Sequence, residues 1–327
     1  MSISRRRIQA WACTLALGAA LAQASPASPN NAPVKILVGF PAGGVVDLVA
    51  RAFAAQLKEE NGSTVIVENR PGASGKIAID NLLSASNQGD TLAVIPVSVA
   101  VLTPQVMKSA NYDAVRDFDM LGILVEYCFA VAAGPAANVG TWQAYKAWAQ
   151  AHPQRSAYAS PGLGTPQQFL GAQLQKALGV ELQHVPYKGG AAAINDLLGG
   201  QVPLLITTEQ LLPAYEAQGK LKTLFVTSHE RNPNMPKVPT AAEVGLPGLE
   251  ASDWFALYAK AGTPPARLAE WRTLVAKIVA SPKFVETIRG MGYGVPSAQP
   301  ADFKRLLREQ QEVWAGRVRL AGFKATD

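Results

Sequence analysis

Short apolar segments alternate with longer amphipathic ones along most of the chain. The segment Val34–Phe40 is rich in Val, Ile and Leu and ends at Gly and Pro, which is typical of a buried strand. From Val46 onward the apolar residues recur at helical spacing until Asn61-Gly62, where a helix is expected to end. Further strands are expected at 64–67, 91–95, 129–133, 157–159, 182–185, 204–207 and 221–226, and further helices at 76–84, 141–151, 165–178, 191–198, 265–280, 282–291 and 301–320. This alternation predicts an α/β fold with mostly parallel sheets flanked by helices.

Three of the expected strands end in loops of small residues that lead directly into a helix. These loops are Pro41-Ala42-Gly43-Gly44, Pro71-Gly72-Ala73-Ser74-Gly75 and Ser160-Pro161-Gly162-Leu163-Gly164-Thr165. In parallel sheets, ligands bind beyond the carboxyl ends of the strands, where helix N-termini leave N–H groups without partners. Three such loops facing one cleft can bind an anion with few charged side chains. The alternative is that each loop is only a tight strand-to-helix turn.

The loop spacings do not fit the common nucleotide-binding motifs. Gly72-Ala73-Ser74-Gly75-Lys76 lacks the four residues that separate the glycines of a P-loop, and Ile77 stands where Ser or Thr would hold magnesium. The segment that begins at Gly162 has Gln167 in place of the third glycine of a dinucleotide fingerprint. No cofactor is therefore expected.

Residues 1–24 have the layout of an export signal that is cleaved. Arg5, Arg6 and Arg7 precede an apolar stretch, and Ala22-Gln23-Ala24 has the small-x-small pattern of a cleavage site. A short N-terminal anchor is the alternative interpretation. Removing this segment lowers the basic residues from 30 to 27 against 24 acidic ones, a net charge of +3, which does not favour a nucleic-acid partner. The length of the remainder and the 48% apolar composition favour two domains.

The side chains able to carry catalysis or bind metal are few. Cys128 is the only cysteine outside the expected signal, so neither an internal disulfide nor a metal site with paired cysteines is expected, and its neighbours Tyr127 and Phe129 suggest burial. His152 and His229 are expected at the surface, whereas His184 ends a strand and can face a cleft. The common hydrolase motifs are absent from the sequence, although a Ser/His/acid set assembled in space remains possible.

Several segments together resemble the Bug family of periplasmic substrate-binding proteins, which are related to the receptor of tripartite tricarboxylate transporters. The segments include FPAGGVVDLVAR, VIVENRPGASGKIAID, YASPGLGTPQQFLGAQL, HVPYKGGAAAINDLLGGQV and VPTAAEVGLPGLEASDWFALYAKAGTP, in this order. The resemblance implies a two-lobed, type II-like Venus-flytrap fold with the ligand enclosed between α/β lobes. It implies lobe 1 at 25–129, lobe 2 at 130–252, and a return to lobe 1 at 253–327.

The glycine loops and the resemblance together indicate the candidate ligand-binding residues. They are Phe40, Pro41, Ala42, Gly43, Gly44, Asp47, Gly72, Ala73, Ser74, Gly75, Ser98, Ser160, Gly162, Gly164, Thr165, His184, Tyr187, Thr207 and Trp254. Asp47 matches an aspartate of the family's first helix, where an acid can either line the cleft or stabilise the helix N-terminus. Trp254 can either stack on a ligand or pack in the core.

The chain departs from the family pattern at positions that affect the ligand. After the third strand the family usually has several polar residues, and here Ser98 alone keeps a pocket hydroxyl. Gln168 stands where His is common, and Pro203 stands where Asp is common. These changes remove charge and polarity, so a mono-acid, an amide or an aromatic compound is favoured over a tri-acid.

The expected function is that of a periplasmic solute-binding receptor. It would act as a monomer without chemistry, metal or cofactor, capturing a small carboxylate or a related polar or aromatic compound between its lobes. It would present this compound to a tripartite tricarboxylate-type transporter. The alternatives are a sensor that signals to a membrane kinase, an exported hydrolase with a site assembled in space, and a structural or adhesive secreted protein.

Overall fold

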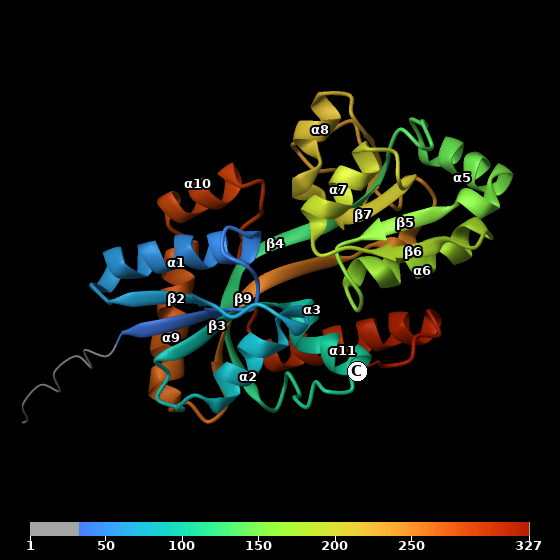
Figure 1. Cartoon of the computed structure of the whole chain (residues 1–327). Coiled ribbons are helices and arrows are strands. Elements are labelled where there is room, and N and C mark those ends of the chain that lie inside the picture. The colour runs from blue at the N-terminus through green and yellow to red at the C-terminus, as the bar shows by residue number, and fades with distance from the viewer. Residues whose placement is uncertain (1–32, 327) are drawn as a thin grey trace, which may run out of the picture. The chain divides into compact units, whose positions relative to one another are not determined.

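The computed structural model describes residues 33–326, which belong to one compact unit of helices and strands (Figure 1). The strands are β1 (Val34–Val38), β2 (Val65–Asn69), β3 (Thr91–Pro96), β4 (Phe118–Ala133), β5 (Ala157–Ser160), β6 (Gln183–Pro186), β7 (Leu204–Thr208), β8 (Lys222–Val226) and β9 (Ser252–Lys260). The helices are α1 (Val45–Asn61), α2 (Lys76–Ser84), α3 (Val97–Val101), α4 (Thr103–Val106), α5 (Trp142–Ala151), α6 (Pro166–Leu178), α7 (Gly190–Leu198), α8 (Pro213–Ala217), α9 (Pro265–Val279), α10 (Pro282–Gly290) and α11 (Phe303–Leu320). The predicted α/β fold is confirmed.

The strands form one mixed sheet in the order β2-β1-β3-β9-β4-β7-β5-β6, and β8 pairs with β4. The pairing is parallel at both ends, where β1 lies between β2 and β3 and where β5 lies between β6 and β7. It is antiparallel in the centre, where β9 joins β3 to β4 and β4 joins β9 to β7. The two parallel ends place the carboxyl ends of β1, β2 and β3, and those of β5 and β6, where loops lead into helices.

The antiparallel centre is the part of the sheet that the sequence pattern does not predict. Strand β4 begins at Phe118 rather than at Phe129, and β9 is a nine-residue strand with no counterpart among the expected elements. Both strands are buried along most of their length. A strand that is covered on both faces has no alternation of polar and apolar residues, so its pattern does not distinguish it from a buried helix.

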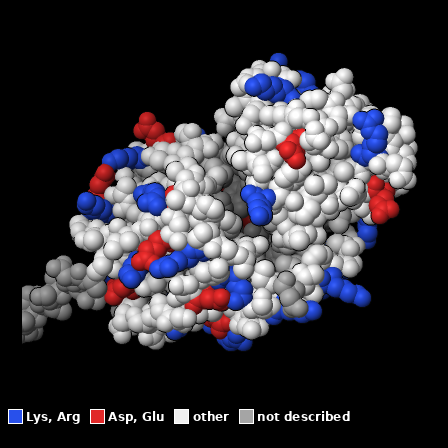
Figure 2. Space-filling model, viewed as in Figure 1, with Lys and Arg blue, Asp and Glu red and all other residues white. Residues whose placement is uncertain are grey.

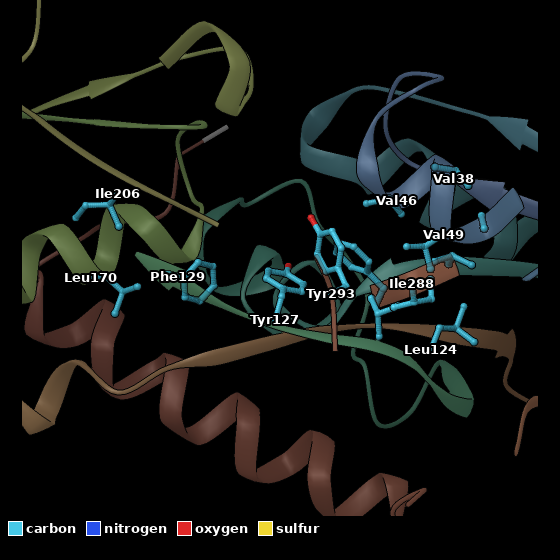
Figure 3. Close-up of a cluster of buried hydrophobic side chains, with 14 of the residues drawn as sticks. Val38, Val46, Val49, Leu124, Tyr127, Phe129, Leu170, Ile206, Ile288 and Tyr293 are labelled. Atoms are coloured by element: carbon cyan, nitrogen blue, oxygen red, sulfur yellow. The ribbon is translucent and has the colours of Figure 1, made fainter. Parts of the chain in front are cut away.

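Strand β4 changes its main partner along its length. Its residues up to Cys128 pair with β9, and its residues from Phe129 pair with β7. Aromatic side chains pack around this change of partner (Figure 3): the ring of Tyr127 lies 5.8 Å from that of Phe129 and 5.9 Å from that of Tyr293, both edge to face. Burial of such a ring contributes about 1.5–3 kcal/mol to the stability of the folded state, so this aromatic packing stabilises the position at which β4 changes its partner.

Cys128 also lies where β4 changes its partner, and it is a free cysteine of intermediate exposure. Burial raises the pKa of its thiol to about 12, so the group is neutral at physiological pH. This agrees with the expectation of a small packed side chain rather than a reactive thiolate.

The expected export signal, residues 1–24, lies outside the described residues. Within residues 33–326, no helix is both long enough and apolar enough to cross a bilayer.

Candidate functional site

Asp47 organises the first glycine loop from within. The Gly43 N–H donates to Asp47 Oδ2 at 2.8 Å, and Arg51 Nε donates to the same oxygen at 2.9 Å. Asn69, at the end of β2, donates through Nδ2 to Asp47 Oδ1 at 2.9 Å and to the Phe40 carbonyl at 3.0 Å. Asp47 is 1% exposed, and both of its carboxylate oxygens accept hydrogen bonds from within the protein.

The charge of Asp47 is stabilised by the same contacts. Burial acts to raise the pKa of its carboxyl, but hydrogen bonds from Arg51, the Gly43 N–H and Asn69 outweigh burial and hold the pKa below the usual aspartate value. Asn69 is a residue that the sequence interpretation missed. Its only signal was a polar residue at the end of a strand beside the loop.

The second glycine loop lies against the first. An added Cβ at Gly39 would be 2.6 Å from the Cα of Gly75, so the two backbones approach more closely than any side chain would permit. Between Gly72 and Gly75, Ala73 and Ser74 have positive φ angles of 47° and 54°. Non-glycine residues in this region are strained and concentrate at functional sites, so the conformation supports a binding role for this loop.

The third loop is held in a similar way by its own helix. The Gly164 N–H donates to Gln168 Oε1 at 2.7 Å, and the Thr165 hydroxyl donates to the Gly162 carbonyl at 2.8 Å. Gln168, which replaces the common histidine of the family, therefore shapes the loop as a first-turn acceptor. The neighbouring loop after β6 is tied to this one, because the N–H of Tyr187 donates to the Ser160 carbonyl at 2.9 Å.

His184 and Ser160 form a hydrogen-bonded pair, but its environment does not fit a catalytic dyad. The Ser160 Oγ lies 2.6 Å from His184 Nε2 and also donates to the Gly162 carbonyl at 3.0 Å, and Ser160 is 0% exposed. Burial lowers the pKa of His184 to about 4, and within residues 33–326 no carboxylate is hydrogen-bonded to its ring. The pair therefore holds the end of β5 to that of β6, while Tyr158 stacks on the imidazole at 4.9 Å.

The backbone donors that remain available are in the first turns of the helices. The N–H groups of Gly43 and Gly164, which the sequence suggested as ligand contacts, are used inside their own loops. Within the described part of the chain, no acceptor is bonded to the N–H groups of Val45 and Val46 in α1 or of Ala191 in α7. Helix N-termini with free N–H groups favour a negatively charged or strongly polar ligand group.

The helices that carry these donors border a recess in the surface. Figure 2, viewed as Figure 1, shows the surface hollowed between the side that carries α1 and the side that carries α7. The third loop also approaches the first half of the chain, because an added Cβ at Gly164 would lie 2.9 Å from Val106 Cγ2 of α4. The third loop is therefore in contact with α4 (Thr103–Val106).

Several other candidate residues are engaged within the protein. The Ser98 N–H donates to Asp253 Oδ1 at 3.4 Å, and Ser98 is buried. Trp254 is 6% exposed and belongs to a hydrophobic core cluster, which corresponds to the packing alternative. Tyr187 donates its hydroxyl to Asp196 Oδ2 at 2.8 Å. The Trp254 indole N–H has no hydrogen-bond partner among the described residues.

Two buried polar groups near the sheet centre have capacity for a further hydrogen bond. Thr207 is 0% exposed, its hydroxyl has no partner among the described residues, and an added Cβ at Gly190 of α7 would lie 3.3 Å from its Oγ1. Asp253 was missed by the sequence interpretation, and its Oδ2 has no partner within residues 33–326. Burial raises the pKa of Asp253 to about 6, because the hydrogen bonds to its charged form do not offset desolvation.

The arrangement is suited to binding a small molecule. Within residues 33–326, no group of three or more His, Cys, Asp or Glu side chains is placed to hold a metal ion. A mixed α/β sheet with helix N-termini on both sides of a central recess is the design of a two-lobed periplasmic binding protein.

The comparisons with known proteins identify the family. Residues 49–321 match the family described as Tripartite tricarboxylate transporter family receptor, and the chain belongs to this family. Protein BugT of Bordetella pertussis is 30% identical over 94% of this chain and 97% of its own length. The predicted relationship to the Bug family is thereby confirmed.

Solved structures share the fold over nearly the whole chain. The periplasmic binding protein BugD has a TM-score of 0.80 at 30% identity and covers 90% of this chain and 99% of its own. Rpa4515 of R. palustris with adipate has a TM-score of 0.82 at 27% identity, covering 90% and 98%. MatC of Rhodopseudomonas palustris with bound malate has a TM-score of 0.78 at 26% identity, covering 88% and 98%. The chain is therefore a ligand-binding receptor of two-lobed architecture.

Proposed function

We propose that this receptor captures a small carboxylate between its lobes and delivers it to a tripartite tricarboxylate-type transporter. The observation that carries the proposal is the placement of unpartnered first-turn N–H groups of α1 and α7 on the two sides of the recess. Such groups stabilise a carboxylate by about 0.3–2 kcal/mol per helix terminus without a charged side chain. The malate and adipate of two structural neighbours support an organic acid as the ligand.

We infer further that the ligand carries one acid group and a polar or aromatic remainder. Ser98 is the candidate pocket hydroxyl that follows β3, and its N–H is bonded to the buried Asp253, an acid that disfavours a second carboxylate beside it. The lobes would comprise 25–129 with 253–327, and 130–252. In a receptor of this class the ligand stabilises the closed member of an equilibrium between open and closed arrangements.

A thermal-shift screen tests the ligand class. The panel contains malate, adipate, monocarboxylates, aromatic acids, their amides and amino acids. A specific ligand at about 100 times its Kd adds roughly 2.7 kcal/mol to the stability of the folded state. We expect the largest stabilisation from a monocarboxylate or an aromatic acid. Stabilisation by none of these compounds would reject the binding function, and stabilisation by malate or adipate alone would reject the single-acid specificity.

A larger side chain in the first glycine loop tests where the ligand binds. An added Cβ at Gly43 meets nothing within 4 Å, so a Gly43→Val side chain would extend into the space beside the free α1 donors. We expect at least about tenfold weaker binding of the best compound of the panel, or roughly 1.4 kcal/mol, by calorimetry. Gly62→Val is the matched control, since Gly62 also has a positive φ and open space but lies at the opposite end of α1. Equal affinities in both variants would place the ligand elsewhere.

A transporter partner is favoured over a sensor kinase by the family description alone, and it is tested in cells. Deletion of the genes for the transporter's membrane subunits should abolish uptake of the identified compound while leaving its binding by the purified receptor intact. Unchanged uptake together with loss of a transcriptional response would favour the sensor.

We also propose that the exported chain begins at Ser25, which an intact-mass measurement of the periplasmic protein decides.

A further inference from the structure

A second cavity lies away from the glycine loops, between helix α11 and the chain segments that flank β8 and β9. Its volume is about 360 Å³, and it is lined by residues 227–229, residues 250–252, Cys128 and one face of α11. None of the candidate residues of the interlobe recess lines it. Cavities that bind small molecules begin at roughly 300 Å³, so the space is large enough for a small organic ligand.

The α11 wall presents a cation and an aromatic ring to the cavity. Gln310, Val313, Trp314 and Arg317 line the cavity and follow the spacing of one helix face. Trp314 is 1% exposed, and its indole N–H has no hydrogen-bond partner among the described residues. Because that nitrogen is covered by the protein, α11 offers the cavity the face of the Trp314 ring rather than its N–H.

Arg317 is half-buried beside Trp314 and has no acidic partner in the described part of the chain. Its Nη2 donates to the Glu250 carbonyl at 2.6 Å, and its guanidinium lies over the Trp314 ring at 4.8 Å. The Glu250 carboxylate faces His229 instead, at 3.7 Å. Desolvation lowers the pKa of Arg317, which means that its charge lacks the compensation that a carboxylate would provide. A planar guanidinium binds carboxylates through two parallel hydrogen bonds.

We propose that this cavity binds a small monocarboxylate, at a site separate from the interlobe recess. The carboxylate accepts from the Arg317 guanidinium, and the apolar part of the molecule packs against Trp314 and Val313. A second carboxylate on the ligand is disfavoured, because the Glu250 carboxylate lies at the wall of the same cavity. The site therefore selects a single acid on a compact apolar body, such as a benzoate.

The test uses 4-fluorobenzoate as the probe and the full purified chain, with binding followed by ¹⁹F nuclear magnetic resonance. Arg317→Met removes the charge and keeps the length of the side chain. Ser252→Phe fills the cavity from the opposite wall and leaves Arg317 intact. Arg319→Met is the matched control, since Arg319 is exposed on the same helix turn and does not line the cavity. The three changes are made in the Gly43→Val background, which removes binding in the interlobe recess, and we expect at least about tenfold weaker binding in the first two variants and unchanged binding in the control.

The Gly43→Val variant separates this site from the interlobe recess. The cavity between α11 and the β8–β9 segments should still bind the probe in this variant. Loss of all binding in Gly43→Val, or unchanged binding in both Arg317→Met and Ser252→Phe, would overturn the proposal. Absence of binding to the parent protein at millimolar probe would also overturn it. Circular dichroism reports whether Arg317→Met folds, and Ser252→Phe alone decides the matter if it does not.

Discussion

Replacing Asp47 by Asn should weaken the folded state strongly, although the change is a single atom. The carboxylate accepts from the Gly43 N–H, Arg51 Nε and Asn69 Nδ2. An amide offers one oxygen, so in either orientation its NH₂ group faces one of these donors. At least one charge-assisted bond is lost, worth about 1.5–3 kcal/mol, and a buried donor is left unpaired. Because Arg51 is half exposed, its charge is screened by solvent, and we expect a total loss of about 2–3 kcal/mol.

Urea unfolding followed by circular dichroism measures this loss, and Asp80→Asn is the control. Asp80 forms a pair of the same chain spacing with Lys76 on α2, but its side chain is 51% exposed. Exposed pairs of this kind contribute about 0.3–0.5 kcal/mol. Equal losses in the two variants would refute the conclusion that Asp47 holds the loop. An unchanged free energy of unfolding together with lost affinity would instead make Asp47 a ligand contact.

Repeating the urea unfolding at low pH gives a second criterion. The pKa of Asp47 is lowered in the folded protein, so its contribution is complete above the usual aspartate value of 3.8 and is lost as the pH falls through the folded value. The difference between the parent and Asp47→Asn should therefore shrink in strong acid. A difference that grows on acidification would contradict the assignment.

Three further changes test the packing and the buried titratable groups. Gly39→Ala places a Cβ against the Gly75 backbone and should lower the free energy of unfolding by about 1–3 kcal/mol, measured with urea. Gly62→Ala is strained only by its φ angle and should lower it by about 1 kcal/mol. A smaller loss for Gly39→Ala than for Gly62→Ala would contradict the close approach of the loops. The folded pKa of Asp253 is raised to about 6. As the pH falls from 6 to 4, the parent should therefore gain stability relative to Asp253→Asn, by at most about 3 kcal/mol. A pH-independent difference would exclude a neutral buried carboxyl. The folded pKa of His184 is lowered to about 4. As the pH falls from 6.5 to 4, the parent should therefore lose stability relative to His184→Gln. A gain in stability over this range would mean that the imidazole is charged in the folded state.

The sequence by itself determined the elements whose signals are local. Helix α2 has the predicted bounds, and the helices α1, α6 and α9 begin or end within one or two residues of prediction, because Gly, Pro and capping residues act on their immediate neighbours. The glycine loops between strands and helices were also evident, since the change from strand to helix periodicity marks them. The family was predicted from the resemblance of several segments, in their order along the chain, to the Bug family, and residues 49–321 match the family model.

The tertiary structure decided what depends on residues far apart in the chain. The antiparallel centre is one example, because Cys128 finds its partner in Ser252 and no local pattern encodes that pairing. The use of the loop donors is another. The glycine loops predict free N–H groups, but in the structure Asp47 accepts from the N–H of Gly43 and Gln168 accepts from that of Gly164. A hydrogen bond depends on the distance between two groups in space, and that distance exists only after the chain has packed.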